Sequence, residues 1–259
     1  MELTLYQIDA FAGEMFKGNP AAVIPLEEWL PDELMQSIAE ENNLSETAFF
    51  VPQKEGYHIR WFTPVAEVDL CGHATLASGY VLFNILGIRD HLISFQSKSG
   101  ILKVAYDGEF LIMDFPAQVP KLCDPPEELL NAFDKTPLEV LKAEDYLVLF
   151  EDEKTIAELK PDFDALKKLD LRGVIVTAKG NDVDFVSRFF APAYAIDEDP
   201  VTGSAHTELT PYWAEKLGKK KLTAKQISKR GGELSCELKG NRVEIVGKAV
   251  KYMEGKIIL

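Results

Sequence analysis

The first half of the chain alternates between strand-like and helix-like spacing of its apolar positions. Helical spacing predicts helices over 31–42 and 74–86, and the second is apolar on nearly every side, which is typical of a buried helix. Alternating positions and short apolar runs bounded by turn residues predict strands over 2–9, 20–25, 47–51, 57–62, 92–96, 101–106 and 110–115.

The second half follows the same plan. It predicts a buried helix from Ser204 to about Leu217, and strands near 145–150, 173–178, 183–190, 225–228, 233–238 and 242–246. Short segments also return in the same order at about half the chain length. They are RWFTP at 60–64 with RFFAP at 188–192, CGHA at 71–74 with TGSA at 202–205, and Gly100 and Gly108 with Gly232 and Gly240. This ordered return indicates an internal duplication.

These patterns predict an α+β fold of two pseudo-symmetric halves, each with mostly antiparallel strands wrapped round one apolar helix. We place the halves at 1–115 and 116–259, because four prolines make 116–126 the best linker candidate. The final strand, residues 250–259, is a candidate to cross back and complete the first half. A cleft between the halves is the expected ligand site, since clefts between domains are favoured for ligands.

Composition narrows the functional classes. The 259 residues carry a net charge of −14 at pH 7, so we expect neither nucleic acid nor an anionic membrane as a partner. No apolar run is long enough to cross a bilayer, and the first residues lack the basic segment of a signal peptide. Cys71, Cys123 and Cys236 lie far apart without a C-x-x-C pair, which favours free thiols and a cytoplasmic location.

The two matched turns form the first candidate site. Each opens a predicted buried helix at a glycine, Gly72 or Gly203, whose missing Cβ lets a ligand approach the backbone. A helix start presents unpaired N–H groups and the positive end of the peptide dipole. Two such turns facing each other would hold a carboxylate or other anion without lysine or arginine. Ordinary capping by Thr202 or Ser204 is the alternative for a single turn.

Individual side chains near these turns are further candidates. Glu46 lies where a polar loop meets an apolar strand, and such shielding suits a carboxylate to proton transfer, although a solvated loop acid fits the same sequence. His73 lies on the glycine turn, and both a catalytic and a structural role are open. Asp199 is either a site acid or a turn acid. Asn19, in a GNP turn, either points its amide into the cleft or holds the turn.

Several cofactor and metal chemistries lack their sequence patterns. No G-x-G-x-x-G follows a predicted strand, and the lysines at 219–221 lack the glycine loop of a phosphate-binding motif. No histidine pair has the spacing of a zinc protease, and residues 202–206 do not form a G-x-S-x-G turn. We therefore expect no cofactor and no metal ion.

Five segments together carry a family resemblance. They are GNPA at 18–21, SETAF at 45–49, RWFTP at 60–64, DLCGHAT at 69–75 and EDPVTGSAH at 198–206. In this order they resemble the PhzF-like (phenazine biosynthesis) isomerase family of the diaminopimelate epimerase superfamily. The resemblance covers nearly the whole chain. It implies two pseudo-symmetric halves, each a strongly curved sheet around a central helix, and relatives suggest a homodimer.

The resemblance also implies roles for individual residues. The glutamate of the SET segment, here Glu46, is the acid/base that moves a proton between substrate carbons. The residues implied to line the pocket and assist are His73, Asp199 and Ser204, with the amides of Gly72 and Gly203 holding the substrate carboxylate.

The diaminopimelate epimerase branch instead uses two cysteines, one in each turn. Cys71 occupies the first of these positions, but Thr202 occupies the second, and a threonine hydroxyl is far too weak an acid to mirror a thiolate. The resemblance therefore implies a cofactor-independent isomerase acting by proton transfer on a small carboxylate-bearing metabolite. The alternatives are an amino-acid or imino-acid epimerase, and a non-catalytic homologue that binds an anionic metabolite.

Overall fold

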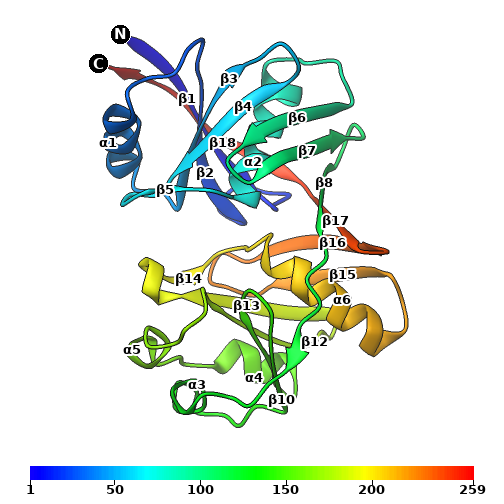
Figure 1. Cartoon of the computed structure of the whole chain (residues 1–259). Coiled ribbons are helices and arrows are strands. Elements are labelled where there is room, and N and C mark those ends of the chain that lie inside the picture. Colours follow the sequence, from blue (N-terminus) through cyan, green and yellow to red (C-terminus); the bar gives the residue numbers. More distant parts are fainter. The chain divides into compact units, whose positions relative to one another are not determined.

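The structure, a computed structural model, describes residues 1–259 and divides into two compact units (Figure 1). The first unit combines Met1–Asp114 with Val246–Leu259, and the second is Phe115–Ile245. No helix is both long enough and apolar enough to pass through a bilayer.

The first unit is built mainly of strands. Its helices are α1 (Asp32–Asn42), α2 (Gly72–Tyr80) and the π-helical turn η1 (Val81–Ile85) that continues α2. Its strands are β1 (Glu2–Ala10), β2 (Asn19–Pro25), β3 (Glu46–Pro52), β4 (Tyr57–Phe62), β5 (Glu67–Val68), β6 (Leu92–Ser97), β7 (Gly100–Tyr106), β8 (Leu111–Pro116) and β18 (Ala249–Ile258).

Most strand pairs of the first unit are antiparallel. β1 pairs with β18 and with β2, so the chain ends lie side by side (Figure 1). The parallel pairs are β2–β3 and β4–β6, and β6, β7 and β8 form a meander. α2 packs against β1, β2, β3 and β7, and its residues 73–79 are all buried, because this helix has no polar face to present to water.

The second unit has the same kinds of element. Its helices are α3 (Glu127–Asn131), α4 (Glu153–Glu158), α5 (Phe163–Leu166), the 3₁₀ turn η2 (Pro192–Tyr194) and α6 (Ala205–Leu217). Its strands are β9 (Lys121–Leu122), β10 (Glu139–Lys142), β11 (Tyr146–Leu149), β12 (Val174–Lys179), β13 (Phe185–Ala191), β14 (Ile196–Asp199), β15 (Lys221–Gln226), β16 (Gly232–Lys239) and β17 (Arg242–Gly247).

The strand pairings of the second unit repeat those of the first. β10–β11 is antiparallel and β11–β12 parallel, as are β1–β2 and β2–β3. β13 pairs antiparallel with the short β14 and parallel with β15, as β4 does with β5 and β6. α6 lies between β14 and β15 in the chain, as α2 lies between β5 and β6, and packs on β15 and β16. The α+β fold of two pseudo-symmetric halves expected from the sequence is confirmed.

An arginine–glutamate pair recurs at the same place in each unit. Arg60, on β4, donates from Nε and Nη2 to Glu67 at 2.7 and 2.9 Å. Arg188, on β13, donates from the same atoms to Glu198 at 2.7 and 3.0 Å. Each guanidinium also lies over the phenylalanine two residues later in the chain, at 5.1 and 5.0 Å from the ring centre. The repeated R-x-F sequence thus has a repeated structural role.

The sequence pattern missed some elements and displaced others. The short strand β10 and the short helices α3, α4 and α5 had no strong apolar period and were not predicted. β15 begins at Lys221, earlier than the predicted 225–228, and Leu222, Ala224 and Gln226 are its buried positions.

Candidate functional site

Three predicted site residues of the first unit come from separate elements and converge. Glu46 is the first residue of β3, Asn19 the first residue of β2, and His73 lies in the first turn of α2. β2 and β3 run parallel, so their first residues lie at the same edge of the sheet. All three residues are buried, with exposed fractions of 9, 0 and 5%.

The ring of His73 connects these side chains. Its Nε2 atom lies 3.1 Å from Oε2 of Glu46. On the other side of the ring, Nδ1 lies 3.2 Å from the Asn19 amide nitrogen and 3.6 Å from Sγ of Cys71. An amide can present either its N–H or its carbonyl oxygen, so Asn19 can serve a neutral or a protonated ring. We call Asn19, Glu46, Cys71 and His73 the first cluster.

Burial and charge set the protonation of this cluster. Burial, together with the charge of Glu46, raises the pKa of the Cys71 thiol to about 11, so the thiol is neutral at pH 7. Burial by itself lowers the pKa of His73, but the contacts of the ring with Cys71 and Glu46 outweigh it and raise that pKa well above its usual value. Glu46 and His73 therefore form a buried ion pair.

The first cluster also holds the donor types of a metal site. One atom each of Glu46, Cys71 and His73 lie within 4.8 Å of one another. However, Cys71 approaches Nδ1 whereas Glu46 approaches Nε2, on opposite sides of the ring. A single ion on one ring nitrogen cannot take both in this orientation. The geometry favours a chain of proton-bearing groups over a metal centre.

The GNP turn is held by its glycine. Gly18 has a φ of +66°, and a Cβ there would lie 2.1 Å from the carbonyl oxygen of Ala10. No other residue fits this turn without strain. Gly18 therefore fixes the point at which β2 begins, and with it the position of Asn19.

The second unit places its predicted residues in the turn between β14 and α6. The hydroxyl of Thr202 donates to Oδ2 of Asp199 at 2.5 Å. Gln226, at the end of β15, accepts from the Thr202 amide at 2.8 Å and donates to the Asp199 carbonyl at 2.8 Å. Gln226 is buried and holds the two ends of the turn together through these hydrogen bonds, a role that no sequence pattern indicated. The Thr202 hydroxyl thus holds Asp199 at the position where a two-cysteine mechanism would need its second thiol.

His206 is part of the support for this turn. Its Nδ1 lies 2.8 Å from the Thr202 carbonyl oxygen, and the side chain is completely buried. Burial lowers the pKa of His206 to about 4, so the ring is neutral and Nδ1–H donates to the carbonyl. This arrangement agrees with a structural role for the residue.

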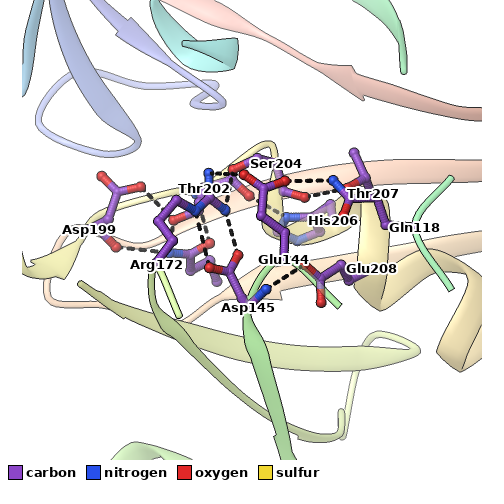
Figure 2. Close-up of polar contacts among 11 residues, drawn as sticks. Gln118, Glu144, Asp145, Arg172, Asp199, Thr202, Ser204, His206, Thr207 and Glu208 are labelled. Carbon is purple, nitrogen blue, oxygen red and sulfur yellow. Dashed lines mark hydrogen bonds and ion pairs between the residues drawn. The ribbon is translucent and has the colours of Figure 1, made fainter. Parts of the chain in front are cut away.

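Ser204 contacts a half-buried arginine, paired with a buried aspartate, that the sequence did not suggest. Nη2 of Arg172 donates to Oγ of Ser204 at 3.1 Å, and Arg172 also pairs with the carboxylate of Asp145 (Figure 2). The main-chain N–H of Asp145 donates to Glu208, one turn along α6 from Ser204. The sequence argument for an anion site at this turn included no arginine, and the structure adds Arg172 as a neighbour of its serine. We call Asp199, Thr202, Ser204, Arg172 and Asp145 the second cluster.

Both helices that open at these turns lack a side-chain cap. Cys71 and Ser204 occupy the cap positions of α2 and α6, and neither side chain accepts a hydrogen bond from the helix. The simple capping alternative for Ser204 is therefore not what the structure shows. The backbone groups at Gly72 and Gly203 remain the candidates for carboxylate binding.

Comparison with known proteins decides the family. The sequence model of the phenazine biosynthesis-like proteins matches residues 8–255. An uncharacterized isomerase of Pseudomonas aeruginosa is 56% identical over 259 residues, with 100% of both chains covered. The chain belongs to the phenazine biosynthesis-like (PhzF) family. The relatives' names agree with the isomerase class expected from the sequence.

Solved structures support the fold of this PhzF-family chain. A phenazine biosynthesis protein of the PhzF family from Enterococcus faecalis is 50% identical, covers 100% of both chains and has a TM-score of 0.98. A hydroxyproline epimerase from Agrobacterium vitis, 10% identical, covers 99% of this chain and 92% of its own with a TM-score of 0.65. The second likeness shows the fold alone. The diaminopimelate epimerase-like architecture expected from the resemblance is thus confirmed.

Proposed function

We propose that this protein is a cofactor-independent isomerase that moves a proton on a small carboxylate-bearing metabolite, with Glu46 as the acid/base. The 3.1 Å contact between Glu46 and His73 in a buried position is the observation that carries this proposal. A carboxylate shielded from bulk water can take a proton from a substrate carbon and return it at another carbon before it exchanges with solvent.

The other residues of the first cluster serve this transfer. His73 holds the Glu46 carboxylate and balances its charge. When Glu46 takes up the substrate proton, the ring faces a neutral acid, and Asn19 on the far side of the ring can turn its amide to suit either ring state. The amide of Gly72, at the start of α2, is proposed to hold the substrate carboxylate.

The second cluster carries the remaining proposed roles. The TGS turn corresponds to the CGH turn in the duplicated sequence, and both open a buried helix. Asp199 is proposed to assist the proton transfer, and Gly203 and Ser204 to bind the substrate. The 2.5 Å bond from Thr202 supports this by keeping the Asp199 carboxylate in one orientation.

An epimerase that uses a thiol is the second candidate, favoured by the placement of Cys71 against His73. Two observations weigh against it. The pKa of Cys71 is raised to about 11, and the hydroxyl at the corresponding position, Thr202, is engaged with Asp199. A homologue that only binds its metabolite is the third candidate.

Gentle purification followed by mass spectrometry of the bound small molecules tests the proposal. The expected ligand is a small carboxylate. Incubating it with the protein in D₂O should give a positional isomer, with little or no deuterium if Glu46 alone carries the proton. Unchanged ligand with no exchanged position would support the binding homologue. Inversion at one carbon with one deuterium incorporated would support the epimerase.

We also propose a cytoplasmic location and a homodimer. Cys71, Cys123 and Cys236 are all free thiols, which supports a reducing cytoplasmic location. β18 exposes Tyr252, Met253 and Ile258, and this apolar surface supports a homodimer. Sedimentation velocity of the purified protein tests the second point.

A further inference from the structure

The Asp145–Arg172 pair is placed to act on Ser204. The guanidinium donates from Nε to Oδ1 of Asp145 at 3.1 Å and from Nη2 to Oδ2 at 2.5 Å, which is the two-pronged geometry of a strong pair. Asp145 has no exposed surface, and the guanidinium lies over the ring of Phe189 at 5.4 Å. Arg172 is thus fixed on one edge by a carboxylate and on one face by an aromatic ring.

The pair is locked to the helix that carries Ser204. The main-chain N–H of Asp145 donates to Oε1 of Glu208 at 3.1 Å, four residues after Ser204 on α6. Gln118 adds a second tie, because its N–H donates to the carbonyl of Thr207 and its side chain donates to Glu144 (Figure 2). These contacts hold Arg172 and Ser204 next to each other.

Arg172 is not itself free to bind an anion. Asp145 pairs with it directly, and Glu144 lies 3.4 Å from its Nη1. Two carboxylates against one guanidinium leave no net positive charge at this point. An arginine so neutralised gives little attraction to a carboxylate ligand, so its action must pass through the group it touches, which is Ser204.

The contact determines whether the Ser204 hydroxyl donates or accepts a hydrogen bond toward the substrate. A guanidinium has donors and no acceptor, so Oγ of Ser204 must accept from Arg172. The hydroxyl proton is then left to donate to another group. We infer that Arg172, anchored by Asp145, is a positioning residue that fixes Ser204 as a hydrogen-bond donor, and that the substrate atom at Ser204 is an acceptor, such as a carboxylate oxygen. This inference rests on the proposed function for the binding role of Ser204.

Acetate is the probe for the test, since it is the simplest carboxylate acceptor. Acetate is titrated at constant ionic strength into the ¹⁵N-labelled protein, and the amide signals of Gly203 and Ser204 are followed. Wild type is expected to show saturable shifts there. Ser204→Ala and Arg172→Lys should each raise the Kd about 3- to 10-fold, the effect of one hydrogen bond. Ser204→Thr, which keeps the hydroxyl, should bind nearly as wild type.

The double variant separates positioning from direct binding. If Arg172 acts only through Ser204, the pair Arg172→Lys and Ser204→Ala should bind acetate no more weakly than Ser204→Ala alone. Arg188→Lys is the matched control, because Arg188 forms the same kind of pair with Glu198 and also lies over a phenylalanine. It should leave the acetate Kd unchanged.

Three results would overturn the inference. The first is a Kd increase in the double variant equal to the product of the two single increases. The second is an acetate Kd unchanged by both single substitutions. The third is the absence of amide shifts at Gly203 and Ser204 in wild type. The proposed function fails by a different result, the absence of proton transfer on the bound metabolite. Acetate binding does not depend on Glu46, so the two can fail separately.

Discussion

Nε2 of His73 lies 3.1 Å from Oε2 of Glu46, and both side chains are buried. The contact joins the first residue of β3 to the first turn of α2, so it depends on how the sheet and its central helix pack. A buried carboxylate needs such a partner, since an unpaired charge in this position would be costly. At rest the pair therefore needs a proton on the ring or between its members.

Replacement of Glu46 by glutamine should abolish most activity. Glutamine keeps the shape but removes the basic group, and general acid/base catalysis is typically worth about 10²–10⁴-fold. We expect a loss of at least that size in kcat, with ligand binding retained, measured on the metabolite identified by mass spectrometry. Glu41→Gln, on the exposed surface of α1, is the matched control and should be as active as wild type.

Substitution of Cys71 should cost far less. Its thiol is neutral at pH 7, because burial and the charge of Glu46 raise its pKa to about 11. It has no thiol counterpart at Thr202. Cys71→Ala is expected to reduce kcat less than tenfold in the same assay. A dead Cys71→Ala beside a nearly normal Glu46→Gln would reject the one-carboxylate mechanism in favour of a thiol-dependent epimerase.

Two buried groups on α6 should give the free energy of unfolding opposite pH dependences. Burial, with the charge of Asp145, raises the pKa of Glu208 to about 8, so its stabilising contribution is present below about pH 4.5 and is lost as pH rises toward 8. Burial lowers the pKa of His206 to about 4, so stability falls as pH drops from about 6.5 to about 4, because the unfolded chain binds a proton at this ring and the folded chain does not. The two windows overlap between about pH 4.5 and 6.5, where their effects offset each other, so stability should fall below about pH 4.5 and above about pH 6.5.

Glu208→Gln isolates the contribution of Glu208 to the pH dependence of stability. Glutamine cannot ionise, so the variant should lose the decline that Glu208 causes as pH rises from about 4.5 to about 8, a difference on the order of 2–4 kcal/mol at pH 9. Urea unfolding at pH 5, 7 and 9 measures it. Glu215→Gln, an exposed position on the same helix, should follow wild type at every pH. Parallel curves for Glu208→Gln and wild type would mean that Glu208 is ionised in the fold.

The repeated fold could be predicted from the sequence because its evidence is local. R-x-F, the glycine turns and the two apolar helices each lie within a few residues, and each returns once. The Asp145–Arg172–Ser204 group could not be predicted in this way. Its members come from the start of β11, a loop before β12 and the start of α6, and they meet only after the sheet forms. Nothing in the local sequence distinguishes Arg172 from a surface arginine.

The candidate site likewise contains residues that local motifs predict and residues that only the folded sheet brings in. Glu46, His73 and Asn19 belong to short motifs, and the structure brings all three together. Gln226 closes the Asp199 turn from a strand that follows in the chain, and its role is set by pairing in the sheet rather than by any motif.

Gly79 should be intolerant of a methyl group because α2 packs tightly against β7. A Cβ at Gly79 would lie 2.8 Å from Cγ1 of Val104, which is completely buried. Alanine improves helix propensity by about 1 kcal/mol, but overpacking a closed core costs about 1–3 kcal/mol, so Gly79→Ala should be destabilising overall in urea unfolding.

Gly255→Ala is the control, since nothing lies within 4 Å of a Cβ there, and its stability should be unchanged or slightly higher. Adding Val104→Ala to Gly79→Ala should cost less than Val104→Ala costs in wild type, because the smaller side chain makes room for the new methyl group. A more stable Gly79→Ala would show that the helix can move away from the strand, and that the position of His73 depends less on this packing than the structure indicates.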